Sequence, residues 1–296
     1  MDFENTAIIT DSSASIPKEM LSEKGMYMMP MSIIDKDGNI LTSGSDITSE
    51  EMEERLREGE QFTTAAVAPG DMVNAINEAV TDGYDQAIVV TTSSGLSTTY
   101  ATACMLAGEL AETDKIQLDV IDSLSIGAAT GLVTLEAKTL VEEGIEFQKI
   151  ANRMTGAVTQ TEVWFAMPTL EWLHKGGRID ELTYRIGSFL DIKPIITCDE
   201  HGKYVVKKRS RGWKKVIPTQ ISLAEEMASR FHNIRLAVSS TKSKQDEAND
   251  MVATIKEKLK ELDVVIDEIL STEFPPELLV HTGPDAVGLA VQGTTL

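Results

Sequence analysis

Three segments of the chain share one pattern, in which a mostly apolar, β-branched run ends in hydroxyl residues and a helical pattern follows. The runs span 7–9, 87–90 and 118–121, and the polar stretches after them span 10–13, 91–94 and 122–123. Continuous apolar strands are typical of a parallel sheet covered by helices on both faces. Residues 69–80 open with Pro69 and residues 127–143 stop before Gly144, as helices commonly do. The pattern predicts an α/β fold whose first sheet is mostly parallel and flanked by helices.

The order of strands and helices changes near residue 160. Further strands are predicted at 162–167, 193–198, 203–206, 234–239 and 264–270, and further helices at 169–174, 180–190, 213–230 and 243–262. The two strands on either side of 199–202 form a predicted hairpin. Residues 278–281 read as the end of an apolar strand that enters a loop at His281. We therefore predict two α/β domains, residues 1–160 and residues 161–296.

The net charge of the chain restricts the classes of partner that it can bind. Its 296 residues carry a formal net charge of −20, from 47 acidic and 27 basic side chains, so nucleic acid and anionic membranes would be repelled over most of the surface. The amino-terminal stretch lacks the basic-then-apolar plan of a secretory signal, and no apolar run approaches the roughly 18 residues that a membrane span needs. We expect a cytoplasmic location without stable membrane insertion.

Metal and nucleotide sites have little support in the sequence. The two cysteines, Cys104 and Cys198, have no CxxC partner, and both are expected to be buried free thiols rather than zinc ligands or a disulfide. No GxGxxG motif follows a predicted strand and no P-loop motif is present, so neither a dinucleotide site nor a P-loop is indicated. No cofactor and no metal are predicted.

The hydroxyl-rich turns are the strongest candidate for a ligand site. Because the carboxyl ends of parallel strands meet at one edge of a sheet, we expect the turns at Ser12, Ser93 and Ser123 to lie close together. Hydroxyl groups, backbone amides and helix N-termini can hold a monoanion such as a carboxylate, whereas a di- or triphosphate ordinarily requires cations. A single hydroxyl in such a turn is more often a cap, as Ser97 or Thr98 would be, so only the density of hydroxyls indicates binding.

Six stretches, in this order along nearly the whole chain, resemble the DegV family of bacterial fatty-acid-binding proteins. They are IITDSSASIP, TTSSGLSTTY, VIDSLSIGAATG, TLEWLHKGGRI, FLDIKPII and VHTGPDAVGL. The resemblance implies two α/β domains with a long acyl chain buried between and within them. It also implies that the protein catalyses nothing itself and presents the bound long-chain fatty acid to a separate fatty acid kinase, which makes an acyl phosphate for phospholipid synthesis.

The same resemblance implies the residues of the carboxylate site. The family's hydroxyls fall on Ser93 or Ser94 and on Thr63 or Thr64, with the choice within each pair left open, and the family's histidine falls on His281. The matching stretches also contain residues that we expect to support the site, namely Asp11, Ser12, Gly95, Ser123 and, from the KGGR motif, Arg178.

The stretch 207–215 is unusual in so acidic a chain, because it holds six basic residues in nine positions. It is either a solvated loop or a functional surface. As a functional surface it would dock the partner kinase or lie near the nucleotide phosphates during transfer, and Arg209 and Arg211 are the residues that we assign to it. Two other functions are considered. A serine esterase would use Ser94 or Ser97 with His281 as its base, but the final glycine of a GxSxG elbow is missing and no acidic orienting residue is evident. A lipid-responsive sensor is not separated from a carrier by any sequence feature.

Overall fold

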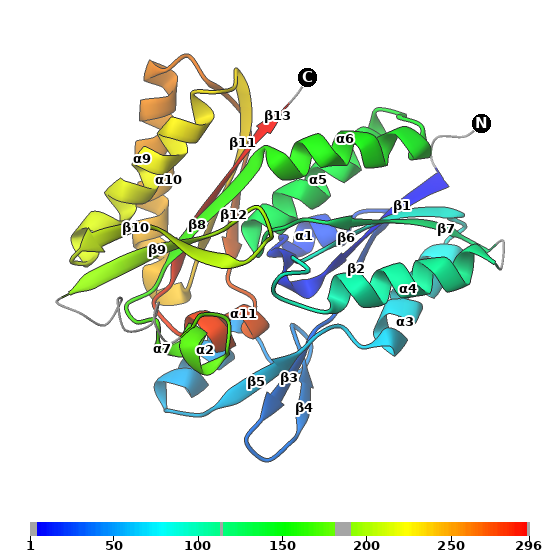
Figure 1. Cartoon of the computed structure of the whole chain (residues 1–296), viewed down its shortest axis with the longest axis horizontal. Coiled ribbons are helices and arrows are strands. Elements are labelled where there is room, and N and C mark those ends of the chain that lie inside the picture. The colour runs from blue at the N-terminus through cyan, green and yellow to red at the C-terminus, as the bar shows by residue number, and fades with distance from the viewer. Residues whose placement is uncertain (1–4, 113–114, 181–190, 295–296) are drawn as a thin grey trace.

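The computed structural model describes residues 5–112, 115–180 and 191–294, and its strands form three sheets within these ranges (Figure 1). The strands are β1 (Thr6–Asp11), β2 (Met26–Met29), β3 (Ser32–Asp35), β4 (Ile40–Thr42), β5 (Phe62–Ala65), β6 (Gln86–Thr91), β7 (Gln117–Asp122), β8 (Thr161–Ala166), β9 (Ile192–Cys198), β10 (Tyr204–Arg211), β11 (Asn233–Ser240), β12 (Val265–Glu273) and β13 (Val287–Thr294). The helices are α1 (Lys18–Leu21), α2 (Ser49–Arg57), α3 (Pro69–Thr81), α4 (Thr99–Ala111), α5 (Ala128–Glu142), α6 (Phe147–Thr159), α7 (Glu171–Lys175), α9 (Val216–Ala228), α10 (Gln245–Glu261) and α11 (Pro276–Thr282).

The first sheet confirms the parallel arrangement predicted from the apolar runs. Its strands follow the order β2-β1-β6-β7, and every neighbouring pair is parallel. Successive residues of β1 pack on opposite faces, with Ile9 in the core under α3 and α4 and Ile8 in the core under α5 and α6. Burial on both faces explains why β1 and β6 are so apolar, whereas the edge strand β7 is only partly buried and carries Asp119.

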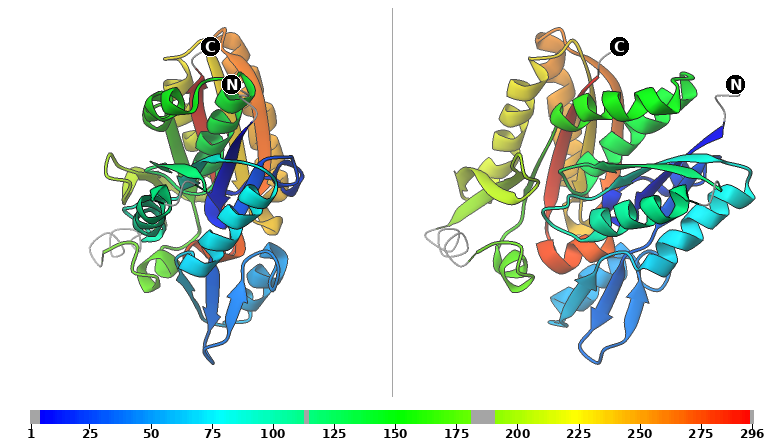
Figure 2. Two further views of the ribbon diagram at one scale, coloured as in Figure 1. Left: turned by 90° about the vertical axis from the view of Figure 1, so that its right-hand side faces the viewer. Right: turned by 45° about the vertical axis from the view of Figure 1, so that its right-hand side comes forward.

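The second sheet is mixed and has the order β10-β9-β8-β13-β11-β12. Only the described pair β11 and β12 runs parallel. Helices α9 and α10 pack on one face of it, and α5 packs against β8, β11 and β13 on the other, so α5 lies between the two large sheets (Figure 2). The strands of the first sheet precede residue 160 and those of the second follow it, which fits the predicted division into residues 1–160 and 161–296; the division itself remains a prediction.

A smaller antiparallel sheet, β4-β3-β5, lies below the two large sheets in Figure 1. Helix α11 packs against α2, α7, β3 and β5, although more than 200 residues separate it from α2 and β5 in the sequence. This position brings a late segment of the chain against an early one, and it creates the candidate site described below.

Several local predictions differ from the structure. The strand predicted before His281 is wrong, because residues 276–282 form α11, and Pro276 at its first position supplies a backbone angle that suits a helix start. Strand β10 extends to Arg211, so much of the basic stretch lies in a strand rather than a loop. Cys104 is exposed on α4 and Cys198 is only partly buried, which corrects the expectation of two buried thiols. Apart from residue 180, the helix predicted at 180–190 lies outside the described residues.

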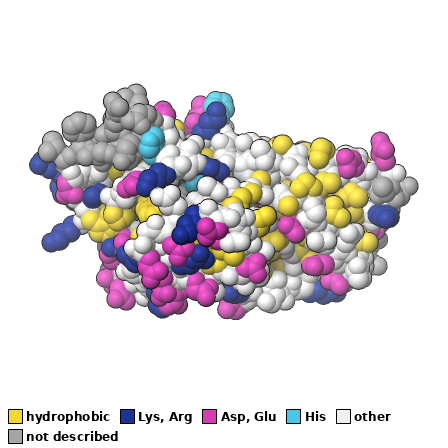
Figure 3. Space-filling view, turned by 90° about the horizontal axis from the view of Figure 1, so that it is seen from below, with side chains coloured by type: hydrophobic (Ala, Val, Ile, Leu, Met, Phe, Trp, Pro, Cys, Tyr) yellow, Lys and Arg dark blue, Asp and Glu magenta, His cyan; other side chains and the backbone are white. Residues whose placement is uncertain are grey.

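Across the ranges that the structure describes, no helix is both long enough and apolar enough to cross a membrane. Figure 3 shows acidic side chains on the lower face of the molecule, interspersed with lysines and arginines.

Candidate functional site

The three polar turns do converge, and much of their hydrogen bonding is with one another. The buried carboxylate of Asp11 accepts a hydrogen bond from the backbone nitrogen of Thr92 at 2.7 Å, and the backbone nitrogen of Ser93 donates to the carbonyl of Ser125 at 2.8 Å. The hydroxyl of Ser123 lies 3.0 Å from that of Thr130. Burial raises the pKa of Asp11 although its hydrogen bonds act against this. These contacts give Asp11 and Ser123 a structural role at the strand ends.

Ser93 is fully buried beneath the turn of the β9–β10 hairpin. Its hydroxyl donates to the carbonyl of Gly202 at 2.9 Å and accepts from the backbone nitrogen of Gly95 at 3.0 Å. A Cβ atom on Gly202 would lie 1.8 Å from the Ser93 oxygen, so only glycine allows this approach. Ser94 differs, because its side chain is exposed and its backbone nitrogen donates to Asp122 at 3.1 Å. Of the two candidate serines, Ser93 is therefore the one in a buried polar setting.

Thr64 and His281 form the second part of the site. The hydroxyl of Thr64, on β5, lies 2.8 Å from Nε2 of His281, on α11. Thr63 is exposed, because neighbouring residues of a strand point to opposite faces. The structure thus distinguishes two threonines that the sequence does not. Within the described residues, no hydrogen bond joins this pair to the Ser93 turn.

His281 is held neutral. Burial, together with the positive charge of Arg178, lowers its pKa to about 3. Nδ1 of the ring is buried and has no hydrogen-bond partner in the part of the chain that the structure describes. A proton on Nε2 rather than Nδ1 therefore avoids an unpaired buried N–H group. Nε2–H then donates to the Thr64 oxygen, which leaves the threonine proton free to donate to an anion.

Arg178 supplies the cation that the polar turns lack. One of its terminal nitrogens donates to the carbonyl of Gly176, and its charge acts on His281 through space. A Cβ atom on Gly176 would lie 2.3 Å from Nδ1 of His281, so the KGGR segment packs directly on the imidazole. A hydroxyl, a neutral imidazole and a guanidinium together suit a monoanion such as a carboxylate.

An apolar pocket lies against the six-stranded sheet, and α11 connects it to this polar group, because Thr282 lines the pocket and is adjacent in sequence to His281. Its walls come from the start of α5, from β8, β11 and β13, and from α11. Among its lining residues are Ile126, Val163, Phe165, Phe274, Leu278 and Gly288. The cavity measures about 20 Å³, which is room for roughly one water. Ligand sites are commonly about 300–1,000 Å³, so a long ligand would enter this pocket only if its walls moved apart.

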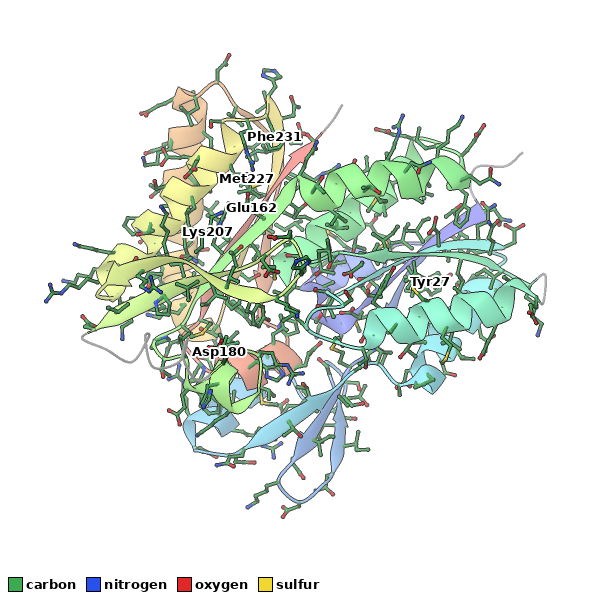
Figure 4. All side chains as sticks on the ribbon, in the orientation of Figure 1. Tyr27, Glu162, Asp180, Lys207, Met227 and Phe231 are labelled. Carbon is green, nitrogen blue, oxygen red and sulfur yellow. The ribbon has the colours of Figure 1, made fainter. Side chains whose placement is uncertain are left out.

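The basic stretch forms part of an exposed sheet edge. Lys207 is 3.3 Å from Glu162 of β8, and Figure 4 shows both side chains on the six-stranded sheet. Arg209 and Arg211 are exposed, and no ion pair holds either of them within the described residues. Cations on an edge strand also discourage pairing with another chain, so their exposure alone does not identify a partner.

No group of three or more metal-binding side chains occurs in the described ranges.

The pH dependence of stability is a first test of the His281 environment. The folded pKa of about 3 lies below the ordinary 6.5, so the folded state binds fewer protons than the unfolded state between these values. The contribution of His281 is therefore fully present above pH 6.5 and is lost as the pH falls toward 3. Relative to a His281→Gln variant, the wild-type melting temperature should fall between pH 6.5 and 4. Parallel curves for the two proteins would show that His281 titrates normally.

Two sequence comparisons place the chain among known proteins. A family model described as "Uncharacterised protein, DegV family" matches residues 5–294. A DegV domain-containing protein of Clostridium acetobutylicum is 30% identical over 289 residues, which cover 97% of this chain and 99% of that protein.

Solved structures give the same answer for the fold. DegV, a fatty acid binding protein from Bacillus subtilis, has a structure that matches with a TM-score of 0.84 and 26% identity, over 98% of this chain and 99% of its own. A stearic acid-binding protein from Eubacterium ventriosum has a TM-score of 0.86, with coverage of 97% and 98%. Its identity is 20%, so that likeness concerns the fold alone.

Proposed function

Because the chain belongs to the DegV family, we propose that it binds one long-chain fatty acid, with the acyl chain in the apolar pocket and the carboxylate at the Thr64–His281 pair. The observation that carries this proposal is the position of α11. The helix contributes Leu278 to the apolar pocket and His281 to the polar group, so one rigid element connects an apolar space with an anion-binding end.

The two ends of the ligand make different contributions to binding. Each methylene removed from water contributes about 0.8 kcal/mol, so the chain supplies most of the affinity. The head group needs partners mainly because an unpaired buried charge would be costly. Thr64 and the cationic Arg178 provide such partners, and the Ser93 turn lies at the ends of the strands of the first sheet. We propose that Ser93 also belongs to the carboxylate site and that Ser94 does not contact the carboxylate.

A calorimetric titration of delipidated protein with stearate tests this function. We expect one site per chain, and we expect octadecanol, which has the same chain and no charge, to bind more weakly. Absence of saturable stearate binding would contradict the proposal. Equal binding of the acid and the alcohol would contradict the carboxylate site while leaving the apolar pocket in place.

We further propose that the bound acid is presented to a separate fatty acid kinase, which forms the acyl phosphate. The exposed cations of β10 support this step, because a surface with unpaired positive charge in a chain of net charge −20 favours an anionic partner. In this scheme the protein positions the carboxylate and the kinase supplies ATP chemistry.

Charge reversal on β10 tests the docking proposal. The double variant Arg209→Glu/Arg211→Glu should slow acyl phosphate formation by the partner kinase at least about tenfold, because opposite charges would become like charges. Stearate affinity should stay unchanged. The control is Lys256→Glu/Lys260→Glu, which makes the same charge change on the exposed side of α10. Equal rates for the two double variants would exclude a docking role for Arg209 and Arg211.

The geometry gives less support to a serine esterase. A nucleophilic serine needs a base within hydrogen-bond reach, and in the described residues His281 bonds to Thr64. The hydroxyl of Ser97 instead lies 2.9 Å from that of Thr99. A fluorophosphonate probe should therefore leave the protein unlabelled.

A further inference from the structure

Glu277 is a buried acid that the proposed function does not use. Only 1% of its surface is exposed, and its carboxylate receives hydrogen bonds from two distant segments of the chain. Ser12, after β1, donates to one oxygen, and Ser43, after β4, donates to the other. No basic side chain pairs with it in the described residues. Burying a carboxylate without a cation is costly, so these two hydroxyls must compensate.

The two hydroxyls belong to one connected unit. The oxygen of Ser12 also accepts a hydrogen bond from the backbone nitrogen of Met31 at 3.0 Å. The carbonyl of Met31 in turn accepts from the backbone nitrogen of Ser43 at 3.1 Å. Glu277 therefore attaches α11 to two segments of the amino-terminal part, at Ser12 and Ser43, which are themselves joined by hydrogen bonds through Met31.

Helix α11 borders two spaces, and Ser15 also lines both of them. Leu278 and Thr282, one turn apart, line the apolar pocket, whereas Pro276, Ser12 and Ser43 line a polar groove of about 960 Å³. Glu277 and His281 are also one turn apart, on a neighbouring face of the same helix. A shift of α11 at Glu277 would thus move the imidazole, widen the pocket and admit water from the groove.

We propose that Glu277 is a positioning residue whose hydrogen bonds to Ser12 and Ser43 hold α11 in place, so that His281 faces Thr64 and the apolar pocket is sealed from the polar groove. This inference rests on the proposed function for its ligand, but the position of α11 can be measured without any ligand. Without these contacts α11 would shift more freely, and a bound acyl chain would leave the pocket faster.

Hydrogen exchange and ligand dissociation test the proposal together. In Glu277→Ala, amides of residues 278–283 in delipidated protein should exchange faster than in wild type, and stearate should dissociate about tenfold faster or more. Glu277→Gln should restore both values, because its carbonyl accepts from Ser12 and its amide donates to Ser43. The control is Glu136→Ala, which removes a different buried contact, with Arg235, between α5 and β11.

The outcomes separate this proposal from the proposed function. If Glu277→Ala matches Glu136→Ala in α11 exchange or in stearate dissociation, Glu277 does not position the helix for binding. If wild type binds no stearate, the proposed function fails, and the exchange of α11 still decides whether Glu277 holds it. Should Glu277→Ala not fold, Ser12→Ala/Ser43→Ala removes the same contacts from the other side, and unchanged values in that variant overturn the proposal.

Discussion

Replacing Gly288 by valine is expected to block long-chain fatty acid binding while the protein still folds. Gly288 lines the apolar pocket from β13, and a Cβ atom there would meet Phe274 and Phe165 at ordinary contact distances of 3.4 and 3.5 Å. The first added carbon therefore fits, and the remaining two fill the space that an acyl chain would occupy. Valine also suits the extended backbone of a strand.

The expected loss follows from the energy of chain burial. If the obstruction keeps three methylenes in water, at about 0.8 kcal/mol each, the stearate affinity falls roughly 50-fold. Val291→Ile serves as the control, because it adds volume to the same strand but on the opposite face, within the core under α9 and α10. Calorimetric titration and melting temperatures of both variants provide the measurement. A Gly288→Val protein that binds stearate as wild type does would place the acyl chain elsewhere.

The second large effect is expected from Thr64→Val. Valine keeps the shape of threonine and removes the hydroxyl that contacts His281 and that we propose as a donor to the carboxylate. A hydrogen bond to a charged group contributes about 1.5–3 kcal/mol, so stearate affinity should fall about 10- to 100-fold, whereas binding of octadecanol should change less.

Thr63→Val is a closely matched control for this variant. It makes the same chemical change one residue earlier on β5, at a side chain that is exposed. Its stearate affinity should equal that of wild type. If the two variants lose affinity equally, the Thr64–His281 pair is not the carboxylate site.

The first sheet could be predicted from sequence because its signal is local. The runs around Ile8 and Ile88 are apolar on both faces of their strands, the run around Val120 is interrupted only by Asp119, and polar turns follow all three at once in the chain. The prediction around His281 failed for a local reason as well. The three apolar residues before it, 278–280, resemble the end of a strand, whereas Pro275–Pro276 just upstream is the signal for a helix start.

The candidate site depends on long-range contacts that a local sequence pattern cannot predict. Thr64 and His281 are 217 residues apart in the sequence, and Ser12 and Glu277 are 265 residues apart. These pairs therefore form only when the sheets pack together. The choice of Thr64 over Thr63 requires the register of β5 against β3. Ser93 shows the same limit, because Gly202, whose carbonyl accepts its hydrogen bond, is 109 residues away. Glu277 gave one signal, an acid within the apolar stretch FPPELLV, but its partners could not be inferred from it.

A crystal structure of the protein with stearate tests the central claim most directly. We predict an acyl chain between the two large sheets, against Leu278 of α11 and Gly288 of β13, with its carboxylate within hydrogen-bond distance of Thr64. A pocket that remains closed in the stearate complex, with the acid bound in the polar groove or on the surface, would contradict the claim.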